Sequence, residues 1–281
     1  MFTLNLHGRL AEYDRPAVMG IINATPDSFY DRSRVADESG FAVRAERMAA
    51  DGADFIDVGA FSTRPGALPV SIDDEVERLR LAIPAVRRGA PGIPVSVDTF
   101  RAEVARVAVE ELGADIVNDV SGGNLDPMMF DTVAELGVPY ILGHMRGEVG
   151  NMMEFTQYED VTADVLSELG DRLQQLALLG VNDVIIDPCF GFSKTLDQNY
   201  ELLANLKLFE LFHRPLLVGV SRKSMITRVL DIDPADALYG TIVINTLALE
   251  RGASVLRVHD VIPAVQAVKI YEKFKSVQTG L

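Results

Sequence analysis

The chain has 281 residues, of which 48% are hydrophobic, enough for one large α/β barrel or two smaller domains. Lys and Arg number 26 against 41 Asp and Glu, so the net charge is −15. This charge argues against a nucleic-acid backbone or an anionic membrane surface as a partner. It does not exclude a small anionic substrate, because a local cluster of cations can form a positive pocket on a negative protein.

Cysteine usage and hydropathy indicate the compartment. The single cysteine, Cys189, rules out an internal disulfide and fits a reducing environment. No apolar run reaches the roughly 18 residues of a membrane span. The polar stretch at 1–15 lacks the basic-then-apolar order of a signal peptide. We therefore expect a soluble cytoplasmic protein.

Short apolar runs recur eight times, and each is followed by a polar loop and a helix-like pattern. Such runs, bounded by turn-forming residues, are typical of strands buried on both faces. The expected strands are 18–23, 55–59, 93–98, 115–120, 139–145, 184–187, 215–220 and 254–261. The clearest expected helices are 41–51, 73–88, 101–112 and a closing helix through 275.

Eight strand–helix alternations in this length predict a single (β/α)₈ TIM barrel, forming one domain over residues 1–281. An open doubly wound sheet is the alternative fold, but its fingerprint of three spaced glycines after the first strand is missing. The long loops after the first, second and fifth strands are candidate lids.

Polar side chains stand at or just after the expected strand ends, which meet at one mouth in such a barrel. They are Asn23, Asp57, Asp98, Asn118, Asp187, Lys223, Arg257 and His259, and the loops add Thr63, Arg64, Ser221 and Arg222. Any one of them alone could cap a helix or tie a turn. Because successive residues of a strand face opposite sides of the sheet, Asp119 or Asp260 could equally be the residue that faces away from the barrel interior.

These side chains form two chemical groups. The first suits the edge of a flat heterocycle, because a carboxylate accepts two parallel N–H donors and an ammonium meets a ring carbonyl. It consists of Asp98, Asn118, Asp187 and Lys223. The second suits an anion, because arginine binds phosphate bidentately. It consists of Asn23, Thr63, Arg64, Arg257 and His259.

The two groups together predict a planar heterocycle that carries a phosphate as the substrate. The sequence contains no Walker loop and no zinc-ligand spacing. A Mg²⁺ ion between phosphate oxygens and an oxygen ligand such as Asn23 is compatible with this set.

Several motifs then agree with one known family. In chain order they are Asn-Ala-Thr-Pro-Asp-Ser-Phe at 23–29, Ser-Thr-Arg-Pro-Gly-Ala at 62–67, Ser-Val-Asp-Thr at 96–99, Asn-Asp-Val-Ser-Gly-Gly at 118–123, Asp-Pro through Lys-Thr at 187–195, Ser-Arg-Lys at 221–223 and Arg-Val-His-Asp-Val at 257–261. From about residue 16 to its end, the chain resembles the dihydropteroate synthases of the folate pathway.

The resemblance implies a (β/α)₈ barrel, usually a homodimer, that acts as a transferase. The implied reaction joins 4-aminobenzoate to the methylene carbon of 6-hydroxymethyl-7,8-dihydropterin pyrophosphate and expels pyrophosphate with Mg²⁺. The arylamine is the nucleophile, so catalysis is mostly electrostatic and positional.

The family's contacts carry over by position. The pterin would be held by Asp98, Asn118, Asp187 and Lys223, and the pyrophosphate by Asn23, Thr63, Arg64, Arg257 and His259. The aminobenzoate slot, where sulfonamides compete, would be lined by Thr63, Pro65, Phe192, Ser221 and Lys223. The implied catalytic residues are Asp98, Lys223 and Arg257, and Asn23 is the implied metal contact. Arg257 would also lie over the pterin ring, and Asp98 would stabilise positive charge on it.

The chain departs from the family pattern at three places. Ala60-Phe61 replaces the frequent Gly-Glu, Cys189 replaces the usual Gly, and Ser193 replaces Gly or Ala. A positive φ at Cys189 would strain the turn by about 1 kcal/mol or more, so we expect Cys189 to avoid it.

Three other functions are compatible with parts of the pattern. A pterin-binding methyltransferase with a corrinoid partner has no pyrophosphate to hold, which the pair Arg257 and His259 argues against. A silent paralogue would bind pterin without turnover. A phosphate-binding aldolase would need Lys223 as its Schiff-base lysine.

Overall fold

The structure is a computed structural model that describes residues 2–25, 38–61 and 70–278. Within them, eight parallel strands form one sheet in the order β8-β7-β6-β5-β4-β3-β10-β9. Their bounds are β3 Ala17–Asn23, β4 Phe55–Gly59, β5 Val95–Asp98, β6 Ile116–Asp119, β7 Tyr140–Leu142, β8 Val184–Ile186, β9 Leu217–Val218 and β10 Val255–Val258. A parallel bridge between Ile186 and Leu216 closes the ring. The predicted barrel is confirmed, and the open doubly wound sheet is wrong.

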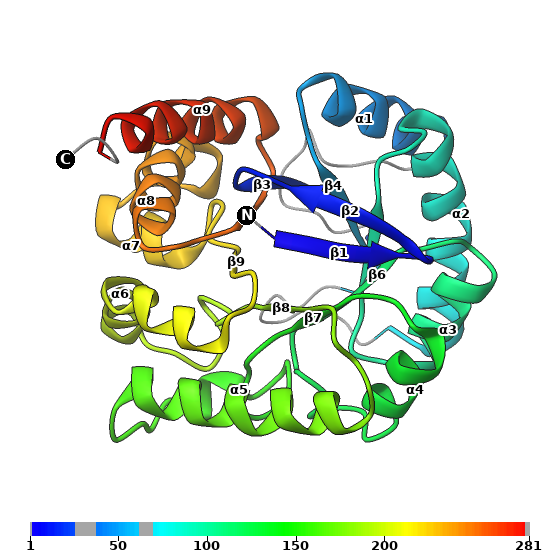
Figure 1. Cartoon of the computed structure of the whole chain (residues 1–281), viewed down its shortest axis with the longest axis horizontal. Coiled ribbons are helices and arrows are strands. Elements are labelled where there is room, and N and C mark those ends of the chain that lie inside the picture. Colours follow the sequence, from blue (N-terminus) through cyan, green and yellow to red (C-terminus); the bar gives the residue numbers. More distant parts are fainter. Residues whose placement is uncertain (1, 26–37, 62–69, 279–281) are drawn as a thin grey trace.

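Helices surround the ring of strands (Figure 1). They are α1 Glu38–Ala50, α2 Ile72–Gly89, α3 Ala102–Glu110, α4 Met129–Leu136, α5 Val161–Leu178, α6 Leu196–Ala204, α7 Ser224–Leu230, α8 Leu238–Glu250 and α9 Val261–Gln278. Short 3₁₀ turns are η2 Met152–Glu154, η3 Leu206–Phe212 and η4 Pro234–Asp236. Among the described helices, none combines the length and apolar character needed to cross a membrane.

An antiparallel hairpin, which the apolar runs of the sequence do not indicate, precedes the barrel. Its strands are β1 Phe2–Leu6 and β2 Arg9–Tyr13. Its side chain Leu4 is buried in one apolar cluster with Met19 and Phe55, which lie inside the ring. Figure 1 shows the hairpin across the middle of the ring. It therefore closes the amino-terminal end of the barrel and leaves the carboxyl end as the mouth.

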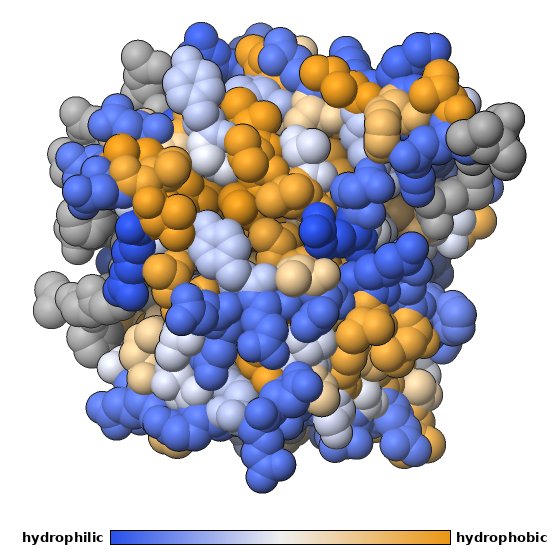
Figure 2. All heavy atoms as spheres, turned by 90° about the vertical axis from the view of Figure 1, so that its left-hand side faces the viewer, coloured by the Kyte–Doolittle hydropathy of each residue, from blue (hydrophilic) through white to orange (hydrophobic). Residues whose placement is uncertain are grey.

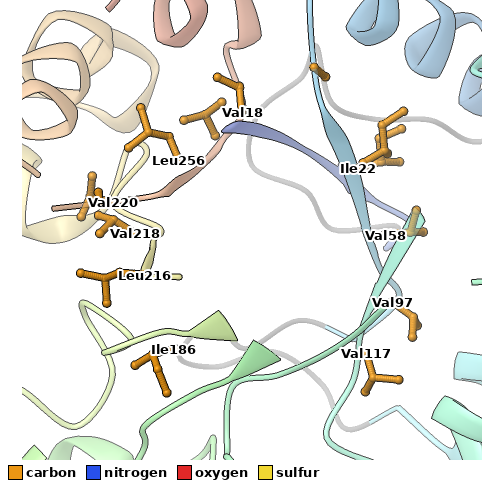
Figure 3. Close-up of a cluster of buried hydrophobic side chains, with 14 of the residues drawn as sticks. Val18, Ile22, Val58, Val97, Val117, Ile186, Leu216, Val218, Val220 and Leu256 are labelled. Carbon is orange, nitrogen blue, oxygen red and sulfur yellow. The ribbon is translucent and has the colours of Figure 1, made fainter. Parts of the chain in front are cut away.

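Alternate strand residues face the helices or the barrel interior. Figure 3 shows outward-facing side chains such as Val18, Val97 and Val117, which belong to the main apolar core. The interior positions change from apolar to polar along the strands, because the hairpin covers one end and the other end opens at the mouth. In the β5–β6 register Asp98 lies beside Asn118. The strand register therefore gathers the polar interior residues at the mouth.

Candidate active site

Arg257 on β10 lies between two carboxylates from neighbouring parts of the barrel. Its Nε donates to Oδ2 of Asp57 at 2.6 Å, and its Nη2 donates to Oδ2 of Asp98. Nδ2 of Asn118 donates to the same Asp57 oxygen at 3.2 Å. Asp57 is fully buried, whereas Asp98 keeps a quarter of its side chain exposed. Asp57 therefore lies at the buried inner end of this cluster, and Asp98 is the carboxylate that solvent can reach.

The cluster perturbs the ionisation of its members. Burial, with the nearby negative charge of Asp57, raises the pKa of Asp98 to about 7. The positive charge of Arg257 acts to lower it but does not offset the burial. Burial acts to lower the pKa of Arg257, but the two carboxylates more than offset this and raise it. Arg257 is therefore permanently cationic, and Asp98 changes its charge near neutral pH.

A second polar group lies on the turn after β8. Oδ1 of Asp187 accepts the backbone N–H of Cys189 at 2.8 Å. Nζ of Lys223 donates to the carbonyl oxygen of Phe190 at 2.6 Å and lies 4.5 Å from the ring centroid of Phe192. Burial raises the pKa of Asp187 and lowers that of Lys223, and each charge opposes the shift of the other. Asp187 and Lys223 thus carry opposite charges at the mouth, and each favours the charged form of the other.

The backbone of this turn is strained. The expectation that Cys189 avoids a positive φ is wrong, because its φ is 53°. Ser193 has a φ of 47°, and Gly191 between them has 85°. A non-glycine residue in this region costs about 1–3 kcal/mol and persists only where surrounding contacts enforce it. At Cys189 the N–H bond to Asp187 is one such contact.

His259 and Ser221 contact each other beside the Arg257 cluster. The backbone N–H of His259 donates to Ser221 Oγ at 3.2 Å, and His259 Nδ1 lies 3.0 Å from the same oxygen. Burial, with the charge of Arg257, lowers the pKa of His259 to about 3, so the ring is neutral at physiological pH. If the hydroxyl donates to Nδ1, the ring proton is left on Nε2, which can then donate to an anion.

The carboxylates whose direction the sequence left open are both engaged away from this cluster. Asp119 faces out of the barrel, where it accepts from the Tyr140 hydroxyl at 2.7 Å and the Gly123 N–H at 2.7 Å. Asp260 is paired with the guanidinium of Arg222 at 2.8 Å. Arg222 therefore ties the start of α7 to the end of β10.

Several predicted site residues lie outside the described residues. They are Thr63, Arg64, Pro65 and the motif residues 26–29. Asn23 is described and ends β3, partly buried. Phe61, one of the departures from the family pattern, packs edge-on against Phe100 with ring centroids 5.0 Å apart. The guanidinium of Arg101 lies 5.2 Å from the Phe61 ring centroid.

Known proteins resemble this chain in sequence over most of its length. Residues 19–259 match the family model described as pterin binding enzyme. The chain belongs to the pterin-binding enzyme family. It is 38% identical over 267 residues to a dihydropteroate synthase of Escherichia coli K12, covering 94% of each chain. It is 40% identical to that of Synechocystis, covering 91% of this chain and 89% of the relative.

Solved structures of the same family share the fold. A Yersinia pestis dihydropteroate synthase with a sulfonamide drug complex superposes with a TM-score of 0.91 at 35% identity, covering 98% of this chain and 100% of the other. The Xanthomonas albilineans enzyme in complex with 7,8-dihydropteroate gives a TM-score of 0.84 at 36% identity, covering 97% and 98%. The barrel described above is thus that of the pterin-binding enzymes.

In this pterin-binding enzyme, two groups had no role assigned from the sequence. Asp57 anchors Arg257 and Asn118, and its signal was a carboxylate in the middle of an apolar strand. Lys194 and His144 are both buried, with Lys194 Nζ 3.1 Å from His144 Nδ1. No sequence signal linked these two residues, because they come from different loops.

Proposed function

We propose that this chain is a dihydropteroate synthase. It joins the amine nitrogen of 4-aminobenzoate to the methylene carbon of 6-hydroxymethyl-7,8-dihydropterin pyrophosphate. The carbon–oxygen bond to pyrophosphate breaks, and the amine loses one proton. The observation that carries the proposal is the pair of sites at one mouth. One site is Arg257, which lies between Asp57 and Asp98 and beside His259. The other site is Asp187 with Lys223.

Residues on the turn after β8 and on strand β6 bind the edge of the pterin through hydrogen bonds. Asp187 accepts two parallel N–H donors, because Oδ1 keeps a second lone pair beyond the bond from Cys189 and Oδ2 takes no part in that bond. Asn118 uses one N–H on Asp57, which orients its amide oxygen and its second N–H. Lys223 keeps two N–H donors beyond Phe190, and one of them meets the ring carbonyl.

Charge stabilisation drives the bond exchange. Arg257 and the Nε2–H of His259 bind the pyrophosphate, which gains negative charge as it leaves. The carboxylate of Asp98, next to Arg257, stabilises the positive charge that develops on the pterin methylene. Phe192, Ser221 and Lys223 line the slot for 4-aminobenzoate and orient the arylamine for attack.

We propose that Mg²⁺ accompanies the pyrophosphate, with Asn23 as its protein contact. Among the described residues there is no cluster of three or more His, Cys, Asp or Glu that could hold a metal. This fits Mg²⁺, which keeps several waters and binds through substrate phosphates with one or two protein oxygens. When bound, the ion would neutralise charge on the leaving pyrophosphate.

We also propose a homodimer formed through the face that α7, α8 and α9 present. Figure 2 shows apolar side chains gathered on this side of the molecule. The face consists of Val229, Leu230, Tyr239, Val243, Leu247, Ile270, Phe274 and Val277, all exposed. A large exposed apolar patch marks an interaction surface, and a second copy of the chain is its occupant. The cytoplasmic location stays a prediction from the sequence.

The test is an assay with dihydropterin pyrophosphate, radiolabelled 4-aminobenzoate and Mg²⁺. We expect labelled dihydropteroate from the wild type, and its loss in Asp187→Asn, because an amide cannot accept both heterocycle donors. Asp197→Asn, on the exposed first turn of α6, is the matched control and should retain activity.

Each alternative function has its own readout in the same preparation. Pterin pyrophosphate binding without product would indicate a silent paralogue. Methyl transfer to a corrinoid would indicate the methyltransferase, and borohydride trapping at Lys223 would indicate an aldolase.

A further inference from the structure

Lys194 is a buried cation that the proposed reaction does not use. Only 2% of it is exposed. Its Nζ is enclosed by the carbonyl oxygens of Phe192 at 3.0 Å, Cys189 at 3.3 Å and His144 at 3.4 Å, and by His144 Nδ1 at 3.1 Å. An ammonium has three N–H donors, so these acceptors occupy all of them. Lys194 has no donor left for a substrate.

Two of the four acceptors on Lys194 belong to the strained turn that carries Asp187 and Phe192. Lys194 binds two carbonyls of this turn, and Lys223 binds a third, that of Phe190, at 2.6 Å. The backbone N–H of Gly191 donates to Asn199 of α6 at 2.6 Å. The side-chain contacts thus hold the unfavourable backbone angles of the turn, and Lys194 supplies the contacts at both ends of Cys189–Phe192.

His144 lies on the loop after β7 and connects that loop to Lys194. Its Nε2 lies 3.0 Å from Glu168 on α5, which also accepts from Arg146 Nε at 2.8 Å. The Arg146 backbone N–H donates to Ser193 Oγ at 3.0 Å, so the two loops are joined at a second point. The series of contacts from Lys194 through His144 to Glu168 therefore connects the turn to α5.

The charge states agree with this arrangement. Burial lowers the pKa of His144 to about 4 and that of Lys194 to about 8. At neutral pH a neutral imidazole thus accepts from the ammonium at Nδ1 and donates from Nε2 to Glu168. Burial acts to raise the pKa of Glu168, yet hydrogen bonds from His144 and Arg146 lower it to about 2, so the final acceptor is ionised.

We propose that Lys194, oriented by His144, is a positioning residue that holds the turn in the conformation that presents Asp187 and Phe192 to the substrates. The proposal rests on the proposed function, because these two side chains bind the pterin and 4-aminobenzoate in that reaction. It explains why a cation is buried where desolvation is costly: two of its acceptors are backbone carbonyls of the turn, and the other two belong to His144.

A pair of substitutions at His144 tests the proposal. His144→Leu removes both ring contacts, whereas His144→Gln offers an amide oxygen to Lys194 and an N–H to Glu168. We expect His144→Leu to raise KM for both substrates at least fivefold and to weaken calorimetric binding of dihydropterin pyrophosphate equally, with kcat changed less than twofold. His144→Gln should stay within twofold of the wild type in all three quantities.

Lys194→Met is the direct variant, and Arg87→Met is its control. We expect a KM increase of at least tenfold in Lys194→Met where it folds. Arg87 donates to Asp115 at 2.6 Å at the closed end of the barrel. Arg87→Met should lower the melting temperature and leave KM unchanged.

Two results would overturn the positioning role. One is a folded His144→Leu protein with wild-type KM and a lower melting temperature. The other is an equal rise in KM in Arg87→Met. If the wild type forms no dihydropteroate, the proposed function fails, and the calorimetric comparison of the two His144 variants still tests Lys194.

Discussion

At Asp98, burial and a neighbouring arginine act in opposite directions, and burial dominates. The pKa of this carboxyl is raised from 3.8 to about 7. In the proposed mechanism only the carboxylate stabilises charge on the pterin. We therefore predict that kcat/KM for 4-aminobenzoate rises with pH from 6 to 7 and levels off above about 8. A pH–rate profile of the wild type checks this.

The matched variant is Asp98→Asn, whose residual activity should lack this acidic limb. A limb that persists would belong to the substrate instead. Stability changes in the opposite sense. Because the folded pKa of Asp98 lies above its unfolded value, the folded state binds the proton more tightly, so the contribution of Asp98 to stability falls as pH rises from about 4 to 7.

The two-carboxylate contact of Arg257 predicts a separable effect on anion binding. Arg257→Lys keeps the positive charge but loses the planar fork that contacts Asp57 and Asp98 together. We predict that affinity for dihydropterin pyrophosphate falls at least tenfold, while affinity for a pterin without phosphate falls less than threefold. Calorimetry with both ligands measures this, and equal losses would count against the anion role.

Among the elements, the amino-terminal hairpin contributes to stability rather than chemistry. Leu4 is 1% exposed beneath the barrel, whereas Leu10 on the paired strand is 62% exposed. We predict that Leu4→Ala lowers the free energy of unfolding by about 2–5 kcal/mol, and that Leu10→Ala changes it by less than about 0.5 kcal/mol. Urea denaturation compares the two. Unchanged KM in both variants would place the hairpin outside the site.

Strand lengths were overestimated where the chain leaves the ladder toward the mouth. Residues 139–145 were predicted as one strand, but β7 ends at Leu142. A Cβ on the following Gly143 would lie 2.5 Å from the carbonyl oxygen of Asp119, so the backbone passes there too closely for any side chain. Likewise 215–220 contains only the short β9, Leu217–Val218. Apolar character continues past the last ladder bond because the departing segment is still buried.

At the scale of the whole molecule, the exposed apolar face of α7, α8 and α9 predicts that two copies of the chain associate. Tyr239 is 80% exposed within the apolar patch, and Leu178 on α5 is 82% exposed outside it. We predict that Tyr239→Glu shifts the proposed dimer toward monomer in sedimentation velocity, and that Leu178→Glu does not. A wild type that sediments as a monomer would contradict the proposed homodimer.

The sequence by itself determined the barrel, its mouth and most of the polar residues there. Eight apolar runs and the residues that follow them are local signals, and period-two alternation carries Asp98 and Asn118 to the same side. The motifs around Asp187, Lys223 and Arg257 were equally visible, because each is a short contiguous stretch.

Only the tertiary structure decided which charges meet. Arg257 finds Asp57 across 200 residues of chain, a pairing set by barrel closure and register rather than by any local pattern. The positive φ of Cys189 was predicted wrongly for the same reason. Local preference disfavours it, and it persists because Asp187 and Lys194, together with His144 from another loop, hold the turn. Long-range contacts of this kind outweigh a local backbone cost of about 1–3 kcal/mol.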